Sequence, residues 1–301
     1  MNILKSVSRS FFLSLRLLPL PMREPVSLAY LLARTSDTIA DCTAAAERKS
    51  GWLRSFEEAL AGAEGGDFQG LADHTSATGE KLLIRHVPEL IAAFQSCPKE
   101  TRDMIEQVVR TIISGQSLDL SRYCEATMDH PKALASREEL DDYTWRVAGC
   151  VGEFWTRIGI HTLGEGFSRA NPDLLCEAGI RYGKGLQIVN IIRDLGGDLR
   201  QGRCYLPVAD PMDRAAMIAE RAWWIKQAKL HLAEGIEYAR HLRGRRVRIA
   251  SGLPASLGLK TLAMLEAQHG SAMSTRIKIP RSEVYRSLAA LLASSLSRPA
   301  R

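Results

Sequence analysis

Four aspartates arranged as two identical pairs are the residues best suited to chemistry in this 301-residue chain. Asp37 and Asp41 stand four positions apart, and Asp194 and Asp198 repeat that spacing. Residues four apart lie on the same side of a helix, one turn from each other. Like charges so placed destabilise a helix by roughly 0.2–0.5 kcal/mol in water, and by more when desolvated, unless a cation or hydrogen bonds compensate. Each pair is therefore a candidate cation site, although either pair alone is also consistent with a water-exposed face paired to arginine.

The segments around the two pairs predict helices that lie inside the protein. Between residues 25 and 41 the charged residues are Arg34, Asp37 and Asp41, and at helical spacing they share a stripe with Tyr30 while apolar residues cover the other sides. Residues 182–198 form the second such segment.

The second segment carries Gly183, Gln187 and Asn190 on the same face as Asp194 and Asp198. If the two helices face each other, four carboxylates point into one cavity. Mg²⁺ prefers one or two carboxylates together with water and phosphate oxygens, so the implied ligand is a diphosphate bound through Mg²⁺. A binuclear hydrolase is the less favoured alternative, because such sites usually include histidines and the seven histidines here are scattered.

Several linked motifs in residues 6–207 resemble the squalene and phytoene synthase family. In chain order they are Ser8-Arg9-Ser10-Phe11, Arg34-x-x-Asp37-x-x-x-Asp41, Tyr143-x-x-x-Val147-Ala148-Gly149-x-Val151-Gly152, Gln187-x-x-Asn190-x-x-Arg193-Asp194-x-x-x-Asp198 and Gly202-Arg203-x-Tyr205-Leu206-Pro207. The segment Gly115 to Leu120 also falls where that family has a related sequence. Gly197 departs from the family by replacing a residue that is usually acidic, and Val7 stands where some relatives carry histidine.

The resemblance implies an all-α, single-domain, isoprenoid synthase-type helical bundle around a central cavity, with residues 1–301 forming one prenyltransferase domain. It also implies head-to-head condensation of two farnesyl diphosphates through presqualene diphosphate to squalene, with Mg²⁺ and reduction by NADPH. Relatives that stop at presqualene diphosphate, or that make dehydrosqualene or phytoene without a reductant, share the same motifs. A catalytically inactive helical scaffold is the non-enzyme alternative. Head-to-tail prenyltransferases and terpene cyclases fit less well, because the chain has no DDxxD cluster.

The same resemblance assigns roles to individual residues. The metal ligands would be Asp37, Asp41, Asn190, Asp194 and Asp198, and the catalytic group adds Tyr143 to the four aspartates. The substrate would contact Ser8, Arg9, Ser10, Phe11, Arg34, Gln187, Asn190 and Arg193. Lys278 and Arg281, in a basic stretch near the end of the chain, would bind the NADPH phosphate. No Rossmann-type glycine motif follows a strand, so a reductant would have to bind in the same cavity.

Each of these roles has a structural alternative. Arg34 and Arg193 could pair with the neighbouring aspartates, and Gln187 and Asn190 could serve helix packing. Tyr143 could be a packed tyrosine, and the serines at 8 and 10 a helix start. The small residues Ala148, Gly149 and Gly152 leave room for isoprenoid tails or allow close helix packing, and the aromatic residues Phe11, Phe12, Phe154 and Trp155 line a tunnel or form ordinary core.

Helical signals dominate the whole chain, and no window alternates with period two. We expect eight to ten helices. A capping box at Ser136 and Glu139 and a cap at Asp210-Pro211 predict helix starts, as does Ser282-Glu283. Predicted ends lie at Gly51, Gly62 with Gly65-Gly66, Gly196-Gly197, Gly244 and Gly270, and Pro19 to Pro21 separates a helix over 11–20 from the next.

Composition limits the class of protein. With 46% hydrophobic and 25% charged residues the chain is typical of globular proteins, and no run is long enough to span a membrane. The six cysteines form no CxxC pair, which favours a reduced, cytoplasmic protein. A net charge of +6 favours anionic partners. The run Arg240, Arg243, Arg245, Arg246 and Arg248 indicates a helix end or peripheral contact with an acidic membrane, and nucleic acid binding is not expected. Nothing in the sequence indicates an oligomeric state.

Overall fold

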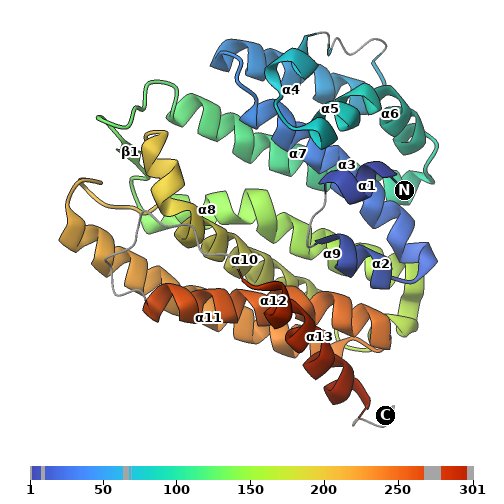
Figure 1. Cartoon of the computed structure of the whole chain (residues 1–301). Coiled ribbons are helices and arrows are strands. Elements are labelled where there is room, and N and C mark those ends of the chain that lie inside the picture. Colours follow the sequence, from blue (N-terminus) through green and yellow to red (C-terminus); the bar gives the residue numbers. More distant parts are fainter. Residues whose placement is uncertain (1, 8–10, 64–67, 69, 268–278, 297–301) are drawn as a thin grey trace.

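Almost every described residue of this computed structural model belongs to a helix or to a short connection between helices (Figure 1). The structure describes residues 2–7, 11–63, 68, 70–267 and 279–296. The elements of the first half are α1 (Asn2–Val7), α2 (Phe11–Leu17), α3 (Leu20–Asp41), α4 (Ala46–Leu60), η1 (Leu71–His74), α5 (Thr78–Arg85), α6 (Val87–Gln95) and α7 (Lys99–Arg122). Those of the second half are β1 (Lys132–Ala133), α8 (Arg137–Thr144), η2 (Trp145–Gly149), α9 (Cys150–Leu163), η3 (Gly164–Gly166), α10 (Pro172–Arg200), β2 (Arg203–Cys204), α11 (Arg214–His241), α12 (Arg245–Ala267) and α13 (Arg281–Leu296).

Two groups of helices meet along α9. Helix α3 packs against α7 and α9, and α4 and α6 cover the outer side of α3, in the upper part of Figure 1. Helix α10 packs against α9 and α11, and α12 closes the other side of α10. The all-α helical bundle expected from the resemblance is confirmed.

Helix α3 has the two-sided burial that its sequence predicts. Its apolar residues Met22, Leu32 and Ile39 are fully buried. The buried hydroxyl groups of Thr35 and Thr38 donate to backbone carbonyls one turn earlier, which satisfies them inside the helix. The aspartates are therefore the polar groups of the last turns that depend on partners outside α3.

A two-residue parallel pairing is the exception to the helical architecture. Lys132 lies opposite Arg203 and Ala133 opposite Cys204, so the connection after α7 runs beside the connection after α10. This pairing places Tyr205 next to the C-terminal end of α7. No periodicity in so short a strand could have predicted it.

Several predicted helix boundaries are confirmed. The hydroxyl group of Ser136 accepts from the amide of Glu139 at 3.3 Å, and the Glu139 carboxylate accepts from the amide of Ala135 at 2.7 Å, which closes the predicted box one residue early. Gly62 follows the end of α4 with φ of 94°, a conformation that favours glycine, and Gly244 separates α11 from α12. Pro19 precedes α3, and α13 begins beside Ser282.

Other predicted boundaries are wrong. Gly51 lies inside α4, and Gly196 and Gly197 lie inside α10, which continues to Arg200. Glycine costs a helix only about 1 kcal/mol relative to alanine, and packing of the neighbouring buried residues offsets that. The N-cap of α11 is Asp213, which accepts from the amides of Ala215 and Ala216, whereas Asp210 closes a turn by accepting from the amide of Met212.

The number of helices is larger than expected. The described residues include thirteen α-helices instead of eight to ten. The difference comes from short helices such as α5 and α6, which are separated by His86 alone, a residue that carries no breaker signal in the sequence. Gly65, Gly66 and Gly270 lie outside the described residues.

Two further expectations concern cysteines and the basic run. All six cysteines are free thiols. Arg248 donates to the carbonyls of Leu242 and Arg243 at 3.0 and 3.2 Å, so it caps the end of α11 as the helix-end interpretation predicts. Among the described residues, no helix combines the length and the apolar character that crossing a bilayer requires.

Candidate active site

Asp37 lies on α3 and faces α7. Its Oδ1 accepts a hydrogen bond of 2.7 Å from Gln116 Nε2, and its Oδ2 lies 3.5 Å from Arg34 Nη1. Although 42% of the side-chain area is accessible to water, protein surrounds the carboxyl group closely enough that desolvation raises its pKa to about 6, with Arg34 opposing the shift. This combination is typical of a group that lines a recess.

Arg34 is held between two carboxylates. Its Nη2 donates to Glu80 Oε1 on α5 at 2.5 Å, while Nη1 faces Asp37. The pairing with the neighbouring aspartate, one of the two interpretations of this arginine, is thus present. Arg34 Nε is buried and has no hydrogen-bond partner among the described residues. A donor in that state indicates that the site has capacity for an additional acceptor.

The second pair lies on α10. Arg193 binds Asp194 with both arms of its guanidinium, at 3.2 and 2.5 Å. Burial, together with the charges of Asp194, Asp119 and Asp41, raises the pKa of Asp198 to about 7 against the lowering effect of Arg203. The Asp198 carboxyl group is therefore surrounded by other carboxyl groups.

The two pairs act on each other electrostatically. The charge of Asp41 contributes to the raised pKa of Asp198, and the Arg203 guanidinium lowers the pKa values of both carboxyl groups against the larger effect of burial. Asp41 is exposed at the end of α3, so the acidic region opens to solvent there. The carboxyl groups of Asp41 on α3 and Asp198 on α10 thus lie within electrostatic range of each other, and the region around them is named the acidic recess.

The donor set fits a hard cation that keeps part of its own hydration shell. All candidate ligands are oxygen donors, and burial raises the pKa values of Asp37, Asp41 and Asp198 among them. In the described part of the chain, no three histidine, cysteine, aspartate or glutamate side chains are close enough to hold a metal ion by themselves. A cation here would need oxygens from water or from a ligand, which is the coordination that Mg²⁺ adopts with phosphates.

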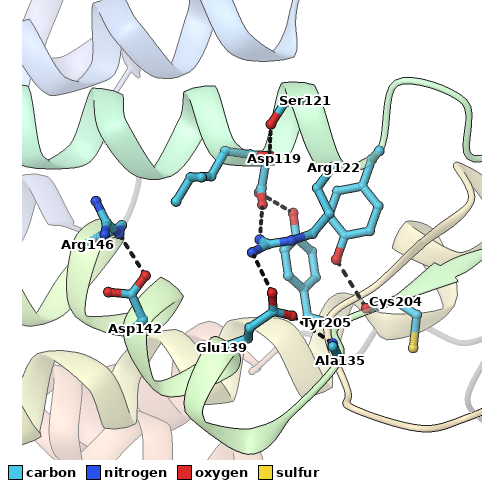
Figure 2. A network of polar contacts seen from close by, with 11 residues as sticks. Asp119, Ser121, Arg122, Ala135, Glu139, Asp142, Arg146, Cys204 and Tyr205 are labelled. Atoms are coloured by element: carbon cyan, nitrogen blue, oxygen red, sulfur yellow. Dashed lines mark hydrogen bonds and ion pairs between the residues drawn. The ribbon is translucent and has the colours of Figure 1, made fainter.

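Asp119 on α7 is a buried carboxylate that the sequence interpretation did not identify. Its Oδ2 accepts from the Tyr205 hydroxyl at 2.7 Å, and its Oδ1 lies 3.6 Å from Arg122 Nη1 (Figure 2). Arg122 continues to Glu139 at 3.5 Å. Burial raises the pKa of Asp119 to about 6 despite the hydrogen bond from Tyr205.

Tyr143 packs directly on this network. Its ring is stacked on that of Tyr205, with centroids 4.8 Å apart and planes inclined by 20°. Burial, followed by the influence of Tyr205 and Asp119, holds the pKa of Tyr143 well above its ordinary value, so the phenol keeps its proton at neutral pH. Tyr143 precedes the single π-helical turn η2, a distortion that is frequent at functional sites.

The motifs that contain these additional residues were visible in the sequence. Gln116 and Asp119 lie in the segment Gly115 to Leu120, and Arg203 and Tyr205 lie in the segment that follows α10. The signal for a role was the isolated acid in an otherwise uncharged helix segment. What was missing was the β1–β2 pairing that brings Tyr205 to Asp119.

A cavity of about 280 Å³ lies along α10, and Asn190, one helical turn before Asp194, is among its lining residues. Residues of η2, α9, α10, α11 and α12 line it, and Gln187 and Asn190 stand at the end nearest Asp194. Asn190 Nδ2 donates to Gln187 Oε1 at 3.3 Å, so each of these amides keeps further hydrogen-bonding capacity. Apart from these amides and a few hydroxyl groups, the lining is apolar.

Small residues form the wall between α9 and α10. A Cβ atom on Gly152 would lie 1.9 Å from the carbonyl oxygen of Gly179, and one on Gly183 would lie 2.2 Å from that of Ala148. Both interpretations of these residues therefore apply, because the residues that let the helices touch also line the cavity. Gly149 is buried against Lys184 and Trp145.

The remaining predicted residues are placed only in part. Ser8, Arg9, Ser10 and Lys278 lie outside the described residues, and of Phe11 and Arg281 the structure describes only the backbone at the start of α2 and α13. Trp155 lines the cavity. Phe154 is core and borders a separate cavity of about 50 Å³, and Phe12 lies beside Arg16.

Comparison with known proteins agrees with this geometry. The family model described as squalene/phytoene synthase matches residues 4–283. The 15-cis-phytoene synthase of Synechocystis sp. is 31% identical over 207 residues, which are 67% of this chain and 53% of the relative. Squalene synthase ERG9 of Gibberella zeae is 25% identical over 296 residues, 93% of this chain and 61% of the relative. The chain thus spans roughly half the length of these curated relatives.

Solved structures show the same fold. The complex of TcSQS with the ligand E5700 superimposes with a TM-score of 0.76 at 21% identity, covering 98% of this chain and 88% of the other. A dehydrosqualene synthase in complex with a ligand gives 0.70 at 20% identity, covering 99% and 95%. Because a family model covers most of its length, the chain belongs to the squalene/phytoene synthase family.

Proposed function

We propose that this protein condenses two prenyl diphosphates head to head in the recess between α3 and α10. The observation that carries the proposal is that carboxyl groups with raised pKa values are followed along α10 by an apolar cavity of about 280 Å³, whose lining residue Asn190 stands one turn before Asp194. One part suits a diphosphate bound with cations, and the other suits a hydrocarbon tail. Family membership supports the same reaction class.

The first step is departure of diphosphate from an allylic carbon. Asp37, Asp41, Asn190, Asp194 and Asp198 would hold Mg²⁺. When bound, the metal ion supplies charge neutralisation for the departing diphosphate. Arg34 and Arg193 contribute planar donors that contact phosphate oxygens, and Arg34 Nε has no competing partner in the described chain. Gln187 and Asn190 orient the ligand at the mouth of the cavity.

The second step needs an environment that tolerates a carbocation. The double bond of the second substrate captures the cation, and loss of a proton then closes a cyclopropane ring. Tyr143 and Tyr205 present stacked aromatic rings beside Asp119, and an aromatic face stabilises a nearby positive charge. The high pKa of Tyr143 keeps its hydroxyl protonated, so it acts as a neutral hydrogen-bond donor.

For the product, we propose squalene, formed from two farnesyl diphosphates through presqualene diphosphate and reduced by NADPH. The match to squalene synthase ERG9 extends over 93% of the chain, whereas that to the phytoene synthase covers 67%. Lys278 and Arg281 are the proposed contacts of the NADPH phosphate. Phytoene synthase is the second candidate, because the relative that is 31% identical carries that name.

Product analysis tests the proposal. Purified protein is incubated with Mg²⁺ and either farnesyl or geranylgeranyl diphosphate, with and without NADPH, and the products are identified by mass spectrometry. Squalene that forms only with NADPH is the expected result. Presqualene diphosphate or dehydrosqualene under both conditions would show that the enzyme does not carry out the reduction. Phytoene would show that the second candidate is the correct function. Absence of diphosphate release from either substrate would contradict catalysis and favour a helical scaffold.

A further inference from the structure

The end of the cavity farthest from the acidic recess is built from three aromatic side chains. From Asn190 to Gly179 the cavity follows α10 for about 16 Å at the usual helical rise. Trp155 of α9, Tyr182 of α10 and Tyr238 of α11 line the distant part. These helices run side by side in the lower half of Figure 1. Bulky rings at this position limit how far a tail entering from the acidic end can extend.

Hydrogen bonds hold each of these rings in place. Trp155 Nε1 donates to Ser251 Oγ at 3.0 Å, and the Tyr182 hydroxyl donates to the Ser251 carbonyl at 2.7 Å. The Tyr238 hydroxyl lies 2.8 Å from Thr156 Oγ1. Ser251 therefore anchors two of the three rings at once.

Helix α12 is irregular beside that anchor. Pro254 lies inside the helix and cannot donate to the carbonyl of Ala250 one turn earlier. Ala250, Ser251 and Pro254 all line the cavity, so the irregular turn of α12 faces the aromatic rings. A wall whose polar groups are paired stays in one arrangement, whereas an unanchored ring could rotate aside.

We infer that Trp155, anchored by Ser251, sets the longest isoprenoid tail that the cavity accepts and restricts it to the fifteen-carbon class. The inference rests on the proposed function and deepens it by assigning the residue that selects substrate length. Trp155 is suited to this role because it lies on α9 just beyond Gly152, where the wall changes from small residues to a large ring. Tyr182 and Tyr238 are buried more completely and form the fixed background of the same wall.

The test compares farnesyl with geranylgeranyl compounds in wild type, Trp155→Ala and Ser251→Ala. Binding of the two S-thiolodiphosphate analogues in the presence of Mg²⁺ is measured by calorimetry, and kcat/KM is measured with the two diphosphates. Wild type should prefer the fifteen-carbon compound in both. Trp155→Ala should raise the twenty-carbon to fifteen-carbon ratio by about 10- to 200-fold, the range expected when a hydrophobic pocket gains room for added methylenes. Ser251→Ala should shift the ratio the same way by less.

Phe154→Leu is the matched control. Phe154 is the preceding residue of α9, and its side chain is as buried as that of Tyr182. It borders the separate cavity of about 50 Å³. Its substitution should leave the ratio unchanged even if it lowers stability. If Trp155→Ala does not fold by circular dichroism, Trp155→Phe replaces it, with a smaller rise expected in the same direction.

The outcomes distinguish the role of Trp155 in length selection from the proposed condensation reaction. A wild type without length preference, or a folded Trp155 variant with an unchanged ratio, overturns the assignment of Trp155 while leaving the reaction class intact. A wild type that neither binds the analogues nor turns over either diphosphate overturns the proposed function itself.

Discussion

Asp37 and Asp198 are carboxyl groups in surroundings that disfavour their charge. Desolvation dominates the pKa of each, and the arginines Arg34 and Arg203 compensate only part of it. A protein that merely needed stability would be better served by a neutral residue at either position. Binding of a cation, as proposed, would recover the free energy that the fold gives up there.

Substitution of one aspartate in each pair separates function from folding. Asp37→Asn and Asp194→Asn should each lower Mg²⁺-dependent turnover by at least about 100-fold. Each substitution removes a negative charge that is proposed to hold the Mg²⁺ ions against the departing diphosphate. Asn at position 37 can still accept from Gln116, so the circular dichroism spectrum and the unfolding midpoint should stay the same or improve. Steady-state assays and thermal unfolding provide the measurements.

Asp103→Asn is the control for that experiment. Asp103 pairs with Lys99 on the exposed side of α7, with half of its side chain accessible. Turnover should remain close to wild type in this variant. Near-normal activity in both Asp37→Asn and Asp194→Asn would show that the assigned ligands are wrong.

At the scale of elements, the contact between α9 and α10 decides the shape of the cavity. The two helices approach through glycines, so that the backbone of one is nearly in contact with the backbone of the other. The cavity continues along the same line of small residues. The π-helical turn η2 begins the same segment and carries Val147 and Ala148 into the wall.

Gly152→Ala should destabilise the protein by about 1–3 kcal/mol, the usual cost of overpacking. The added Cβ would lie 1.9 Å from the Gly179 carbonyl oxygen, and backbone on both sides cannot yield cheaply. Gly51→Ala in α4 is the matched substitution, with no atom within 4 Å of its Cβ, and should stabilise by about 0.4–1 kcal/mol. Urea unfolding midpoints measure both. Equal effects of the two substitutions would mean that the close contact is absent.

Predictability from sequence differs between local and long-range features. The acidic pairs on α3 and α10, the start of α8 at Ser136 and the separation of α2 from α3 by Pro19 follow from spacing and capping within a few residues. The contact of Tyr205 with Asp119 joins residues 86 positions apart and depends on a two-residue strand pairing that has no period of its own. The continuation of α10 through Gly196 and Gly197 also depends on packing, because local propensity opposes it.

On the scale of the whole molecule, the charged carboxyl groups and the apolar cavity occupy different parts of the helical bundle. Carboxyl groups of α3, α7 and α10 raise one another's pKa values, and the cavity extends along α10 from Asn190 toward Gly179. Three carboxyl groups in this region, Asp37, Asp119 and Asp198, have pKa values raised to about 6, 6 and 7. Their common shift makes the stability of the metal-free protein depend on pH.

The direction of this pH dependence follows from the numbers of protons bound by the folded and the unfolded protein. Between about pH 4 and 7 the folded protein holds protons on these groups that the unfolded chain has already released, so their contribution to stability decreases as pH rises through that window. His231 acts in the opposite direction, because burial lowers its pKa and acid then favours the unfolded state. The carboxylate contribution is therefore isolated by comparing wild type with Asp198→Asn, which leaves His231 unchanged.

Without Mg²⁺, the stability of wild type relative to Asp198→Asn should fall as pH rises from about 5 to about 8, since Asp198 becomes charged in a desolvated position. Adding Mg²⁺ should stabilise wild type more at the higher pH, where the carboxylates are ionised and ready to bind, and should stabilise Asp198→Asn less. Chemical unfolding at each pH, with EDTA or Mg²⁺, measures both differences. A relative stability of wild type that increases with pH in EDTA would show that Asp198 is already compensated in the folded protein, and the recess would then have no electrostatic need for a cation at that residue.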